Sequence, residues 1–340
     1  MKRRTVLHKI TAGGALLAAT SLTKVVFAKK PNNLADKPVI LECAINGSTT
    51  KAKNPFAPET YEEQTAEIIR CLDAGATIVH SHSNQPNEDA QAAAAAYKKV
   101  YEPVWKKHPY AILYATANFD PVVYNKTRRT WPSNVQCGHH RILAEAGLAN
   151  MVLFDTGVVP LAGYDNKGKP YPDSSFFWYG FWPDDWQMIM DICNDLGTGT
   201  SISVFEPGWM KNVLAMVKAG TLPRGSKLNI YFAPDGVAAM APPIPEALEL
   251  YLKMMEGLDL KWSVGSIGEP SIMDTPLAQM ALERGGSFRV GLEDWGTGPS
   301  NLDQIQRAKE LINAVGRPIV TGAEAIKYLD IPFEATRPKP

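Results

Sequence analysis

Long hydrophobic runs and an excess of charge are both missing from this sequence. The apolar stretch near the N-terminus, from Ile10 to Leu22, is shorter than the ~20 residues that a helix needs to cross a bilayer core. The 35 Lys and Arg residues balance 35 Asp and Glu residues, and they form no polybasic face. These absences argue against a permanent membrane anchor and against a nucleic acid partner.

Cysteine and histidine are scarce as well. The four cysteines are widely spaced and include no CxxC pair: Cys43, Cys71, Cys137 and Cys193. Such spacing favours burial in separate elements over a dense disulfide framework, although export would permit a disulfide. No histidine follows His140. This excludes the barrel amidohydrolases, because they need further metal-binding histidines on later strands.

The first 28 residues have the organisation of a signal peptide. A basic start that contains Arg3 and Arg4 precedes the apolar stretch, and small residues lead to Ala28. The arginine pair followed by Thr-Val-Leu resembles a twin-arginine signal, which exports proteins already folded. A Sec signal with two chance arginines is the alternative. We therefore predict that the mature chain is exported and periplasmic.

After a polar linker, short β-branched runs alternate with longer helical patterns, which is typical of repeated βα units. The expected strands are Val39–Ile45, Thr77–His82, Ala111–Ala117, Met151–Asp155, Ser201–Glu206, Leu228–Ala233, Trp262–Ile267 and Phe288–Asp294. Eight βα units in about 300 residues predict an α/β fold of the (β/α)8 TIM barrel type. A doubly wound open sheet is the alternative. The predicted segments are a signal peptide at 1–28, a linker at 29–37, a catalytic barrel at 38–331 and a tail at 332–340.

Two long irregular segments interrupt this alternation. Asp120–Gln136 is rich in Asn, Thr, Arg and Pro, and Leu161–Pro183 is dense in aromatic residues. Segments of this length are typical of lids or interface arms. His139 and His140 follow the first segment at the start of a helix, where we expect a surface or capping role.

His80 and His82 end the second predicted strand as His-Ser-His. Because residues i and i+2 lie on one face of a strand, both imidazoles are expected to point the same way. At the C-terminal end of a barrel strand they are well placed to bind Zn²⁺ at ~2.0–2.1 Å. The alternative is a pair of hydrogen-bonding polar residues. A catalytic zinc normally needs a third protein ligand.

The last predicted strand supplies a candidate for that ligand. It carries Arg289, Glu293 and Asp294, and a purely structural strand would not favour three charges at its end. In a closed barrel, strands eight and two flank strand one, so these groups are expected to be near neighbours. Alternation places Arg289 and Glu293 on one face. If that face points to the mouth, Glu293 completes a set of two His and one Glu with an open position for substrate.

With these motifs the sequence resembles the β-keto acid cleavage enzymes, a family that includes 3-keto-5-aminohexanoate cleavage enzyme. The resemblance covers roughly residues 38 to 331. Its landmarks, in chain order, are ILECAINGS, AGATIVHSHS, LYATAN, VFEPGW, WSVGSIG, RVGLEDW and GRPIVTGAEA. The combination of HxH with RVGLED in register is specific.

The resemblance implies a (β/α)8 barrel that binds one Zn²⁺ through His80, His82 and Glu293. The reaction that it implies condenses a β-keto acid with acetyl-CoA and releases acetoacetate and a new acyl-CoA. Zinc suits this chemistry, because it polarises the ketone and stabilises the enolate that forms. Family members usually assemble as tetramers, so a homo-oligomer is expected.

The resemblance also suggests roles for residues around the metal. Asp294 would be the base, and Arg289 matches the arginine that pairs with it and holds it ionised. Thr116 and Glu206 fall on positions that line the family's pocket. Together with Asn46 in ILECAINGS, they are the candidate substrate-binding residues.

Four positions depart from the family pattern. The glutamate after the first strand is replaced by Thr49 or a neighbour, and the arginine after HxH is replaced by Asn84. Ala115 stands where a serine is usual, and Trp295 where an asparagine is common. The metal ligands are thus kept, while the residues around the substrate are changed.

Three functions stay open. The first is the acyl transfer with acetyl-CoA that the family performs. The second is an exported, CoA-independent zinc lyase or hydrolase of a β-dicarbonyl or hydroxy acid, because coenzyme A is a cytoplasmic metabolite. The third is a non-catalytic module that binds a keto acid or a metal. Asp294 beside Arg289 argues against the third, because binding alone does not require a positioned base.

Overall fold

The structure is a computed structural model. It describes residues 34–83, 89–118, 132–161, 177–235 and 237–332. The predicted signal peptide and most of the predicted linker and tail lie outside the described residues, as do Asn84 and most of the first irregular segment. In the described ranges, no helix is both long and apolar enough to span a membrane.

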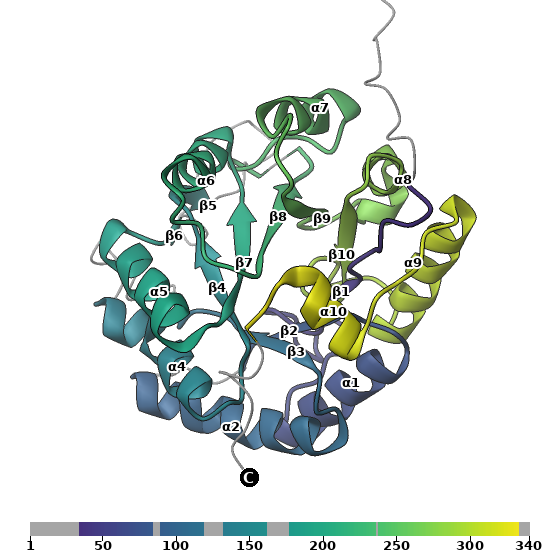
Figure 1. Cartoon of the computed structure of the whole chain (residues 1–340). Coiled ribbons are helices and arrows are strands. Elements are labelled where there is room, and N and C mark those ends of the chain that lie inside the picture. Colours follow the sequence, from purple (N-terminus) through teal and green to yellow (C-terminus); the bar gives the residue numbers. More distant parts are fainter. Residues whose placement is uncertain (1–33, 84–88, 119–131, 162–176, 236, 333–340) are drawn as a thin grey trace, which may run out of the picture. The chain divides into compact units, whose positions relative to one another are not determined.

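Eight parallel strands form the centre of the fold, and helices surround them (Figure 1). Hydrogen bonds join the strands in the order β3-β2-β1-β10-β9-β8-β7-β4, and β3 also lies against β4. The strands are β1 (Glu42–Ala44), β2 (Ile78–Ser81), β3 (Ile112–Ala115), β4 (Met151–Asp155), β7 (Gly199–Val204), β8 (Ser226–Phe232), β9 (Lys261–Ser266) and β10 (Ser287–Val290). The predicted TIM barrel is confirmed, and the alternative of an open sheet is wrong.

The helices begin and end at residues with the expected local chemistry. Thr60 and Glu63 form a capping box at the start of α1, which satisfies backbone N–H groups that a helix start leaves free. Proline opens α5, α6, α7 and α8, where its missing N–H is harmless. The helices are α1 (Tyr61–Asp73), α2 (Ala90–Lys107), α4 (Ser133–Glu145), α5 (Pro183–Leu196), α6 (Pro207–Ala219), α7 (Pro245–Met254), α8 (Pro276–Glu283), α9 (Asn301–Val315) and α10 (Gly322–Leu329), with a short 3-10 turn, η1, at Ile272–Asp274.

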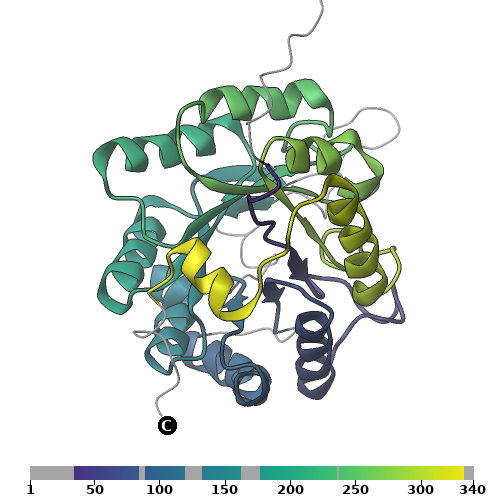
Figure 2. The ribbon, with the colours of Figure 1, turned by 45° about the vertical axis from the view of Figure 1, so that its right-hand side comes forward.

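The C-terminal segment closes the amino-terminal end of the barrel. Val39 pairs with Ile319 just before β1, and the Thr77 hydroxyl donates to the Val320 carbonyl just before β2. The helix that follows, α10, is yellow in Figures 1 and 2 and lies across this end. The opposite end, where the strands have their carboxyl termini, is therefore the end at which a barrel builds its site.

A two-stranded hairpin follows β4. Its strands, β5 (Val158–Leu161) and β6 (Phe177–Gly180), pair antiparallel. The prediction that Leu161–Pro183 is irregular is thus wrong at Phe177–Gly180, and residues 162–176 lie outside the described part. Aromatic packing explains the strand, because Tyr179 stacks on Phe205 with ring centroids 5.4 Å apart.

The four cysteines are free and buried, as predicted. They do not all lie apart, because the Sγ atoms of Cys43 on β1 and Cys71 on α1 are 3.8 Å from each other. The two side chains are part of the core between the barrel and its first helix.

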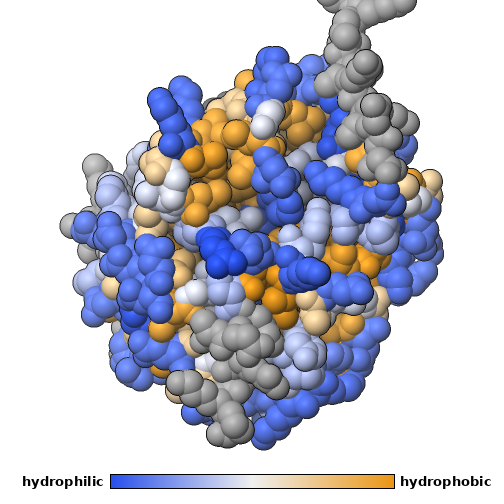
Figure 3. Space-filling view, in the orientation of Figure 1, coloured by the Kyte–Doolittle hydropathy of each residue, from blue (hydrophilic) through white to orange (hydrophobic). Residues whose placement is uncertain are grey.

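Half of the large exposed hydrophobic side chains among the described residues lie on α7 or beside it. Figure 3 shows the face of Figure 1 with apolar side chains concentrated beside α6 and α7. The helix α7 and its flanks carry three exposed large apolar residues: Ile244, Leu250 and Leu258. Contiguous apolar surface of this kind is typical of contacts with another chain. The homo-oligomer stays a prediction.

Candidate metal centre and its surroundings

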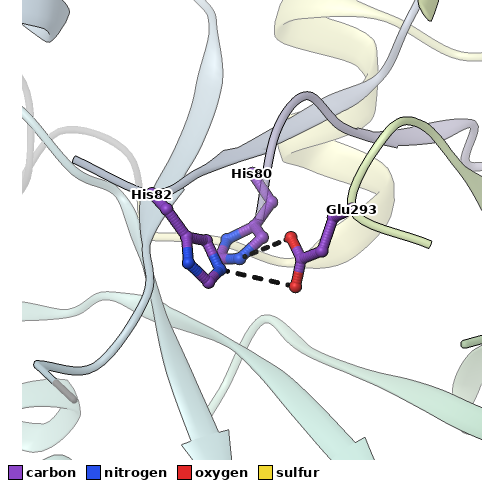
Figure 4. A group of neighbouring side chains, drawn as sticks. All are labelled: His80, His82 and Glu293. Atoms are coloured by element: carbon purple, nitrogen blue, oxygen red, sulfur yellow. Dashed lines mark ion pairs between the residues drawn. The ribbon is translucent and has the colours of Figure 1, made fainter. Parts of the chain in front are cut away.

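Three side chains from opposite ends of the sequence converge at the carboxyl end of the barrel (Figure 4). His80 Nε2 lies 3.2 Å from Glu293 Oε2, and His82 Nε2 lies 3.4 Å from Glu293 Oε1. One ligand atom from each residue lies within 4.8 Å of the other two. The structure thus brings together the three residues that the sequence analysis selected.

Hydrogen bonds to Asn46 and Tyr114 hold the two histidines in place. Asn46 accepts a hydrogen bond from His82 N and donates one to His82 O, both at 2.9 Å, which fixes the chain just beyond β2. The His80 ring stacks on Tyr114 of β3, and its Nδ1 lies 3.2 Å from the Tyr114 carbonyl oxygen. When Nδ1–H donates to that carbonyl, Nε2 is left as the free lone pair that faces Glu293.

Glu293 reaches the histidines from a turn. The predicted strand ran from Phe288 to Asp294, but β10 ends at Val290, so strand alternation is not what aims Glu293. Gly291 directly follows the strand with a φ of +130°, and a Cβ there would lie 2.2 Å from the Ala44 carbonyl oxygen. The turn therefore packs against β1 only because this residue is glycine.

The close approach of Glu293 to β1 depends on a second glycine. Gly47 follows the first strand, and a Cβ on it would lie 2.4 Å from Cγ of Glu293. The backbone N–H of Glu293 donates to the Ala44 carbonyl at 3.2 Å. The two glycines together allow Glu293, the third candidate ligand, to lie beside the histidines.

The donor set fits a divalent metal ion. Ligand atoms at ~2.0–2.1 Å from a tetrahedral zinc lie ~3.3 Å apart. Each histidine Nε2 lies about that far from one oxygen of Glu293, His80 at 3.2 Å from Oε2 and His82 at 3.4 Å from Oε1. Among the described residues, His82 Nε2 and Glu293 Oε2 are buried without a hydrogen-bond partner. Burial lowers the pKa of His80, against the opposing effect of Glu293, which favours the neutral imidazole that binds metal.

Arg289 and Asp294 form an ion pair directly beside this group. Arg289 Nη2 lies 2.8 Å from Asp294 Oδ1 and 3.0 Å from Glu293 Oε1. Arg289 Nε donates to both Asp294 oxygens at 3.1 Å. One buried guanidinium therefore orients both the candidate base and the candidate metal ligand.

The pKa of Asp294 reflects two opposing effects. Arg289 lowers it through its opposite charge and its hydrogen bonds, as expected from the sequence. Burial, helped by the charges of Glu293 and Glu42, outweighs Arg289 and raises the pKa of Asp294 to about 6. A carboxyl with such a pKa is a stronger proton acceptor than an ordinary aspartate.

The three candidate substrate-binding residues occupy different places. Asn46 is fully buried and hydrogen-bonded to the His82 backbone, so it supports a candidate metal ligand. Thr116 is half-buried just beyond β3. Glu206, the N-cap residue of α6, is half-buried and accepts a hydrogen bond from Met240 N at 2.9 Å. Their contacts with substrate stay predictions.

Three of the four positions that depart from the family pattern lie in the described part of the chain, and their contacts are as follows. Thr49 donates to the Leu292 carbonyl at 2.8 Å, which ties the first loop to the turn that carries Glu293. Ala115 lies opposite Ser81, whose hydroxyl contacts Tyr101 of α2. Position 115 therefore faces the helices rather than the barrel interior. Trp295 Nε1 donates to Glu269 at 3.4 Å.

The expected surface role of His139 and His140 is wrong. Both side chains are fully buried in α4, with ring centroids 4.1 Å apart. His139 Nε2 donates to the Thr116 carbonyl at 2.7 Å. The helix presents this pair inward, between Tyr97 of α2 and the end of β3.

Sequence reasoning missed the residues beneath the site. Glu42 of β1, Tyr114 of β3 and Lys227 of β8 lie inside the barrel and connect to Arg289. An available signal was a charge within a run of apolar residues, as in Ile-Leu-Glu-Cys-Ala, because an unpaired charge is rare in a buried strand.

Comparisons with known proteins agree on a family. The sequence model of the family described as beta-keto acid cleavage enzyme matches residues 38–331. The chain is 26% identical over 307 residues to 3-oxoadipate:acetyl-CoA acetyltransferase of Cupriavidus necator, covering 87% of this chain and 96% of that protein. It is 22% identical over 311 residues to 3-keto-5-aminohexanoate cleavage enzyme of Acetoanaerobium sticklandii, covering 86% and 98%.

Solved structures support the fold. The apo structure of ObcA aligns with a TM-score of 0.55 at 18% identity, covering 83% of this chain and 66% of that chain. This chain thus spans about two thirds of the length of ObcA. At this identity the likeness concerns the barrel alone. From its sequence match over residues 38–331, the chain belongs to the β-keto acid cleavage enzyme family.

Proposed function

We propose that this protein uses a divalent metal ion, with zinc as the first candidate, to cleave a β-keto acid with acetyl-CoA as cosubstrate. The observation that carries the proposal is the convergence of His80, His82 and Glu293 next to the Arg289–Asp294 ion pair. Two imidazoles and one carboxylate are the ligands of a catalytic site that leaves a position for substrate.

The metal ion would supply positive charge to the keto and carboxylate oxygens of the substrate. Asp294 then takes a proton from the carbon between the two carbonyl groups, since its pKa of about 6 suits proton abstraction near neutral pH. Arg289 keeps the carboxylate of Asp294 in place through two N–H groups.

Acetyl-CoA is proposed as the second substrate because of the relatives. Two of them are 3-oxoadipate:acetyl-CoA acetyltransferase and the 3,5-dioxohexanoate:acetyl-CoA acetone transferase of Paraburkholderia graminis. In the proposed reaction the deprotonated carbon bonds to the acetyl carbonyl, and the C–S bond between the acetyl group and CoA breaks. The CoA thiolate then bonds to the original keto carbon, and the bond between that carbon and the deprotonated carbon breaks, which gives the new acyl-CoA. The carbanion that is released takes back the proton held by Asp294 and leaves as acetoacetate.

The CoA-independent lyase and the binding module are less well supported. The relatives with acetyl-CoA in their names are similar along nearly their whole length, and the Arg289–Asp294 pair is intact. The predicted signal peptide remains the reason to test the lyase, because coenzyme A is a cytoplasmic metabolite.

The experiment is a product analysis of residues 29–340 with a panel of β-keto acids, with and without acetyl-CoA. We expect acetoacetate and a new acyl-CoA by mass spectrometry only when acetyl-CoA is present. Products formed equally without acetyl-CoA would identify a lyase or hydrolase. Tight binding of a keto acid without products would identify the binding module.

Metal content is measured on the same preparation. We expect about one zinc or similar ion per chain in the wild type. Because each ligand is needed, His80→Ala and Glu293→Ala should lose most of it. His108→Ala, which removes a histidine paired with Asp73 away from the site, is the matched control. Full metal content in the first two variants would reject the site.

A further inference from the structure

The interior of the barrel carries a buried charge network beneath the site. Lys227 Nζ lies 2.6 Å from Glu42 Oε2, and both side chains are fully buried. The amide of Asn229 contacts both residues and donates to Ser201 at 2.9 Å. Barrel interiors are usually filled by layers of branched apolar residues, so this polar centre is unusual.

The network continues upward to the proposed site. Glu42 lies opposite Arg289 in the β1–β10 register, and Arg289 Nη1 is 3.4 Å from Glu42 Oε1. The Tyr114 hydroxyl donates to Glu42 and accepts from Arg289 Nη1 at 3.2 Å. Glu42 therefore holds one side of the guanidinium, while Asp294 and Glu293 hold the other side.

Stability alone does not explain this buried charge network, because removing charged side chains from water costs free energy. A fully buried ion pair is often no more stabilising than apolar residues of the same size. Burial would raise the pKa of Glu42, but Lys227 and Arg289 lower it to about 2, so the carboxylate is ionised. A buried carboxylate with one cation removed would be left partly unpaired and would attract the remaining one.

We propose that Glu42 and Lys227 are positioning residues. Glu42 anchors Arg289 from below, and Lys227 supplies the second cation that keeps Glu42 from drawing Arg289 away from Asp294. The kinetic test of this role rests on the proposed cleavage of a β-keto acid. Its structural test does not depend on activity.

The charge count is consistent with this role. Two cations, Lys227 and Arg289, face three carboxylates, those of Glu42, Glu293 and Asp294. A divalent ion and a substrate with one carboxylate would bring this group to neutrality. Without Lys227 the same group would retain an uncompensated negative charge in the barrel.

The test compares Lys227→Met with the double variant Glu42→Gln/Lys227→Met. In Lys227→Met we expect kcat to fall between about tenfold and a hundredfold with KM within threefold, because the base is displaced and binding is not. In the double variant we expect kcat within about threefold of wild type, because the neutral amide oxygen still accepts from Arg289 and Tyr114.

Crystal structures supply the readout that does not need turnover. In Lys227→Met we expect the Arg289 Nη2–Asp294 contact of 2.8 Å to be broken or lengthened, and in the double variant we expect it to be restored. This comparison separates failure of the positioning role from failure of the proposed reaction. If Lys227→Met does not fold, Lys227→Gln takes its place with the same expected result.

Arg317→Met is the matched control. Arg317 is a buried cation that donates to the backbone carbonyls of Leu282 and Gly286, outside the network. Its loss should lower stability but leave kcat per folded molecule within twofold of wild type. Folded Lys227→Met with unchanged kcat and an unchanged Arg289–Asp294 contact would overturn the proposal. So would a folded double variant as slow as the single one.

Discussion

Asp294 is subject to two opposing influences. Burial raises the pKa of its carboxyl to about 6, and the adjacent guanidinium of Arg289 limits that rise. The result is a carboxyl that changes its charge close to neutral pH while its oxygens stay fixed by three N–H···O contacts. At the scale of one residue, burial supplies basicity and Arg289 supplies position.

A substitution of this residue tests both properties. Asp294→Asn should lower kcat by about 10²–10⁴-fold, the usual contribution of a positioned acid or base. Wild-type kcat/KM should decline as the pH falls through about 6, because a protonated carboxyl cannot accept the substrate proton. Initial rates between pH 5 and 8 measure this.

The control for Asp294 is a surface carboxylate. Asp274→Asn removes an acid that pairs with Arg307 at the surface and should leave the rate unchanged. Activity that stays constant down to about pH 4, the ordinary pKa of an aspartate, would contradict the assignment of Asp294 as base.

We expect His139 and His140 to affect stability, because both side chains are fully buried. Burial lowers the pKa of His139 to about 4 and that of His140 well below its ordinary value. Below about pH 6.5 an unfolded chain takes up protons that the folded chain cannot bind until about pH 4. The free energy of unfolding should therefore decrease as the pH falls through this window, by about 3 kcal/mol for His139.

Urea unfolding at pH 7.5 and pH 5 measures the part of this decrease that falls above pH 5, about 2 kcal/mol for His139. His139→Gln keeps a donor for the Thr116 carbonyl and removes the titrating ring, so its loss of stability between the two pH values should be smaller. His108→Gln removes a histidine that is not part of the buried pair and should behave like the wild type. Equal losses in all three proteins would show that the buried pair is not responsible.

At the scale of elements, the turn after β10 is the most consequential segment. It carries Glu293 and Asp294 and packs directly on β1 because Gly291 has no side chain. Thr49 adds a hydrogen bond from the first loop to Leu292 in this turn. The turn thus holds the candidate ligand Glu293 and the candidate base Asp294 against the first strand of the barrel.

Gly291→Ala tests the importance of this turn. The new Cβ would meet the Ala44 carbonyl at 2.2 Å with φ at +130°, so the turn must move. We expect a loss of at least about 2 kcal/mol in the free energy of unfolding, together with weaker metal binding. Chemical denaturation and metal titration measure the two effects.

Gly220→Ala is the matched control for this substitution. Gly220 also has a positive φ, +70°, but a Cβ there meets nothing within 4 Å. It should lose only about 1 kcal/mol and keep its metal affinity. If both variants bind metal as the wild type does, the turn is not what seats Glu293.

At the scale of the whole molecule, the two ends of the barrel differ: one end is closed by packing and hydrogen bonds, and the other carries the candidate site. The amino-terminal end is closed by the segment before α10 and by Arg317, which donates to backbone carbonyls. The other end gathers the candidate ligands from β2 and from the turn after β10. A metal ion bound by these residues would therefore join the first and last quarters of the described chain.

This joining predicts that metal stabilises the fold as a whole. At a free metal concentration about 100 times Kd, the free energy of unfolding should rise by about 2.7 kcal/mol. Thermal denaturation with added zinc and after chelation measures this difference. Glu293→Ala should show no such rise, and an equal rise in this variant would place the stabilising ion elsewhere.

Several features could be predicted from the sequence because they are local or periodic. The βα alternation gave the barrel, and the His-Ser-His motif and the charged end of the last strand gave His80, His82 and Glu293. The polar interior could not be predicted in the same way. Glu42 and Lys227 are 185 positions apart, and no local sequence pattern predicts that these two side chains form an ion pair.

The sequence by itself determined the candidate metal ligands, since imidazole and carboxylate groups are the donors that metals bind. Only the tertiary structure decided how they are aimed. It placed Glu293 by a glycine turn rather than by strand alternation, raised the pKa of Asp294 by burial, and tied Arg289 to Lys227 through Glu42. Distance and burial set these properties, and both arise only when the barrel closes.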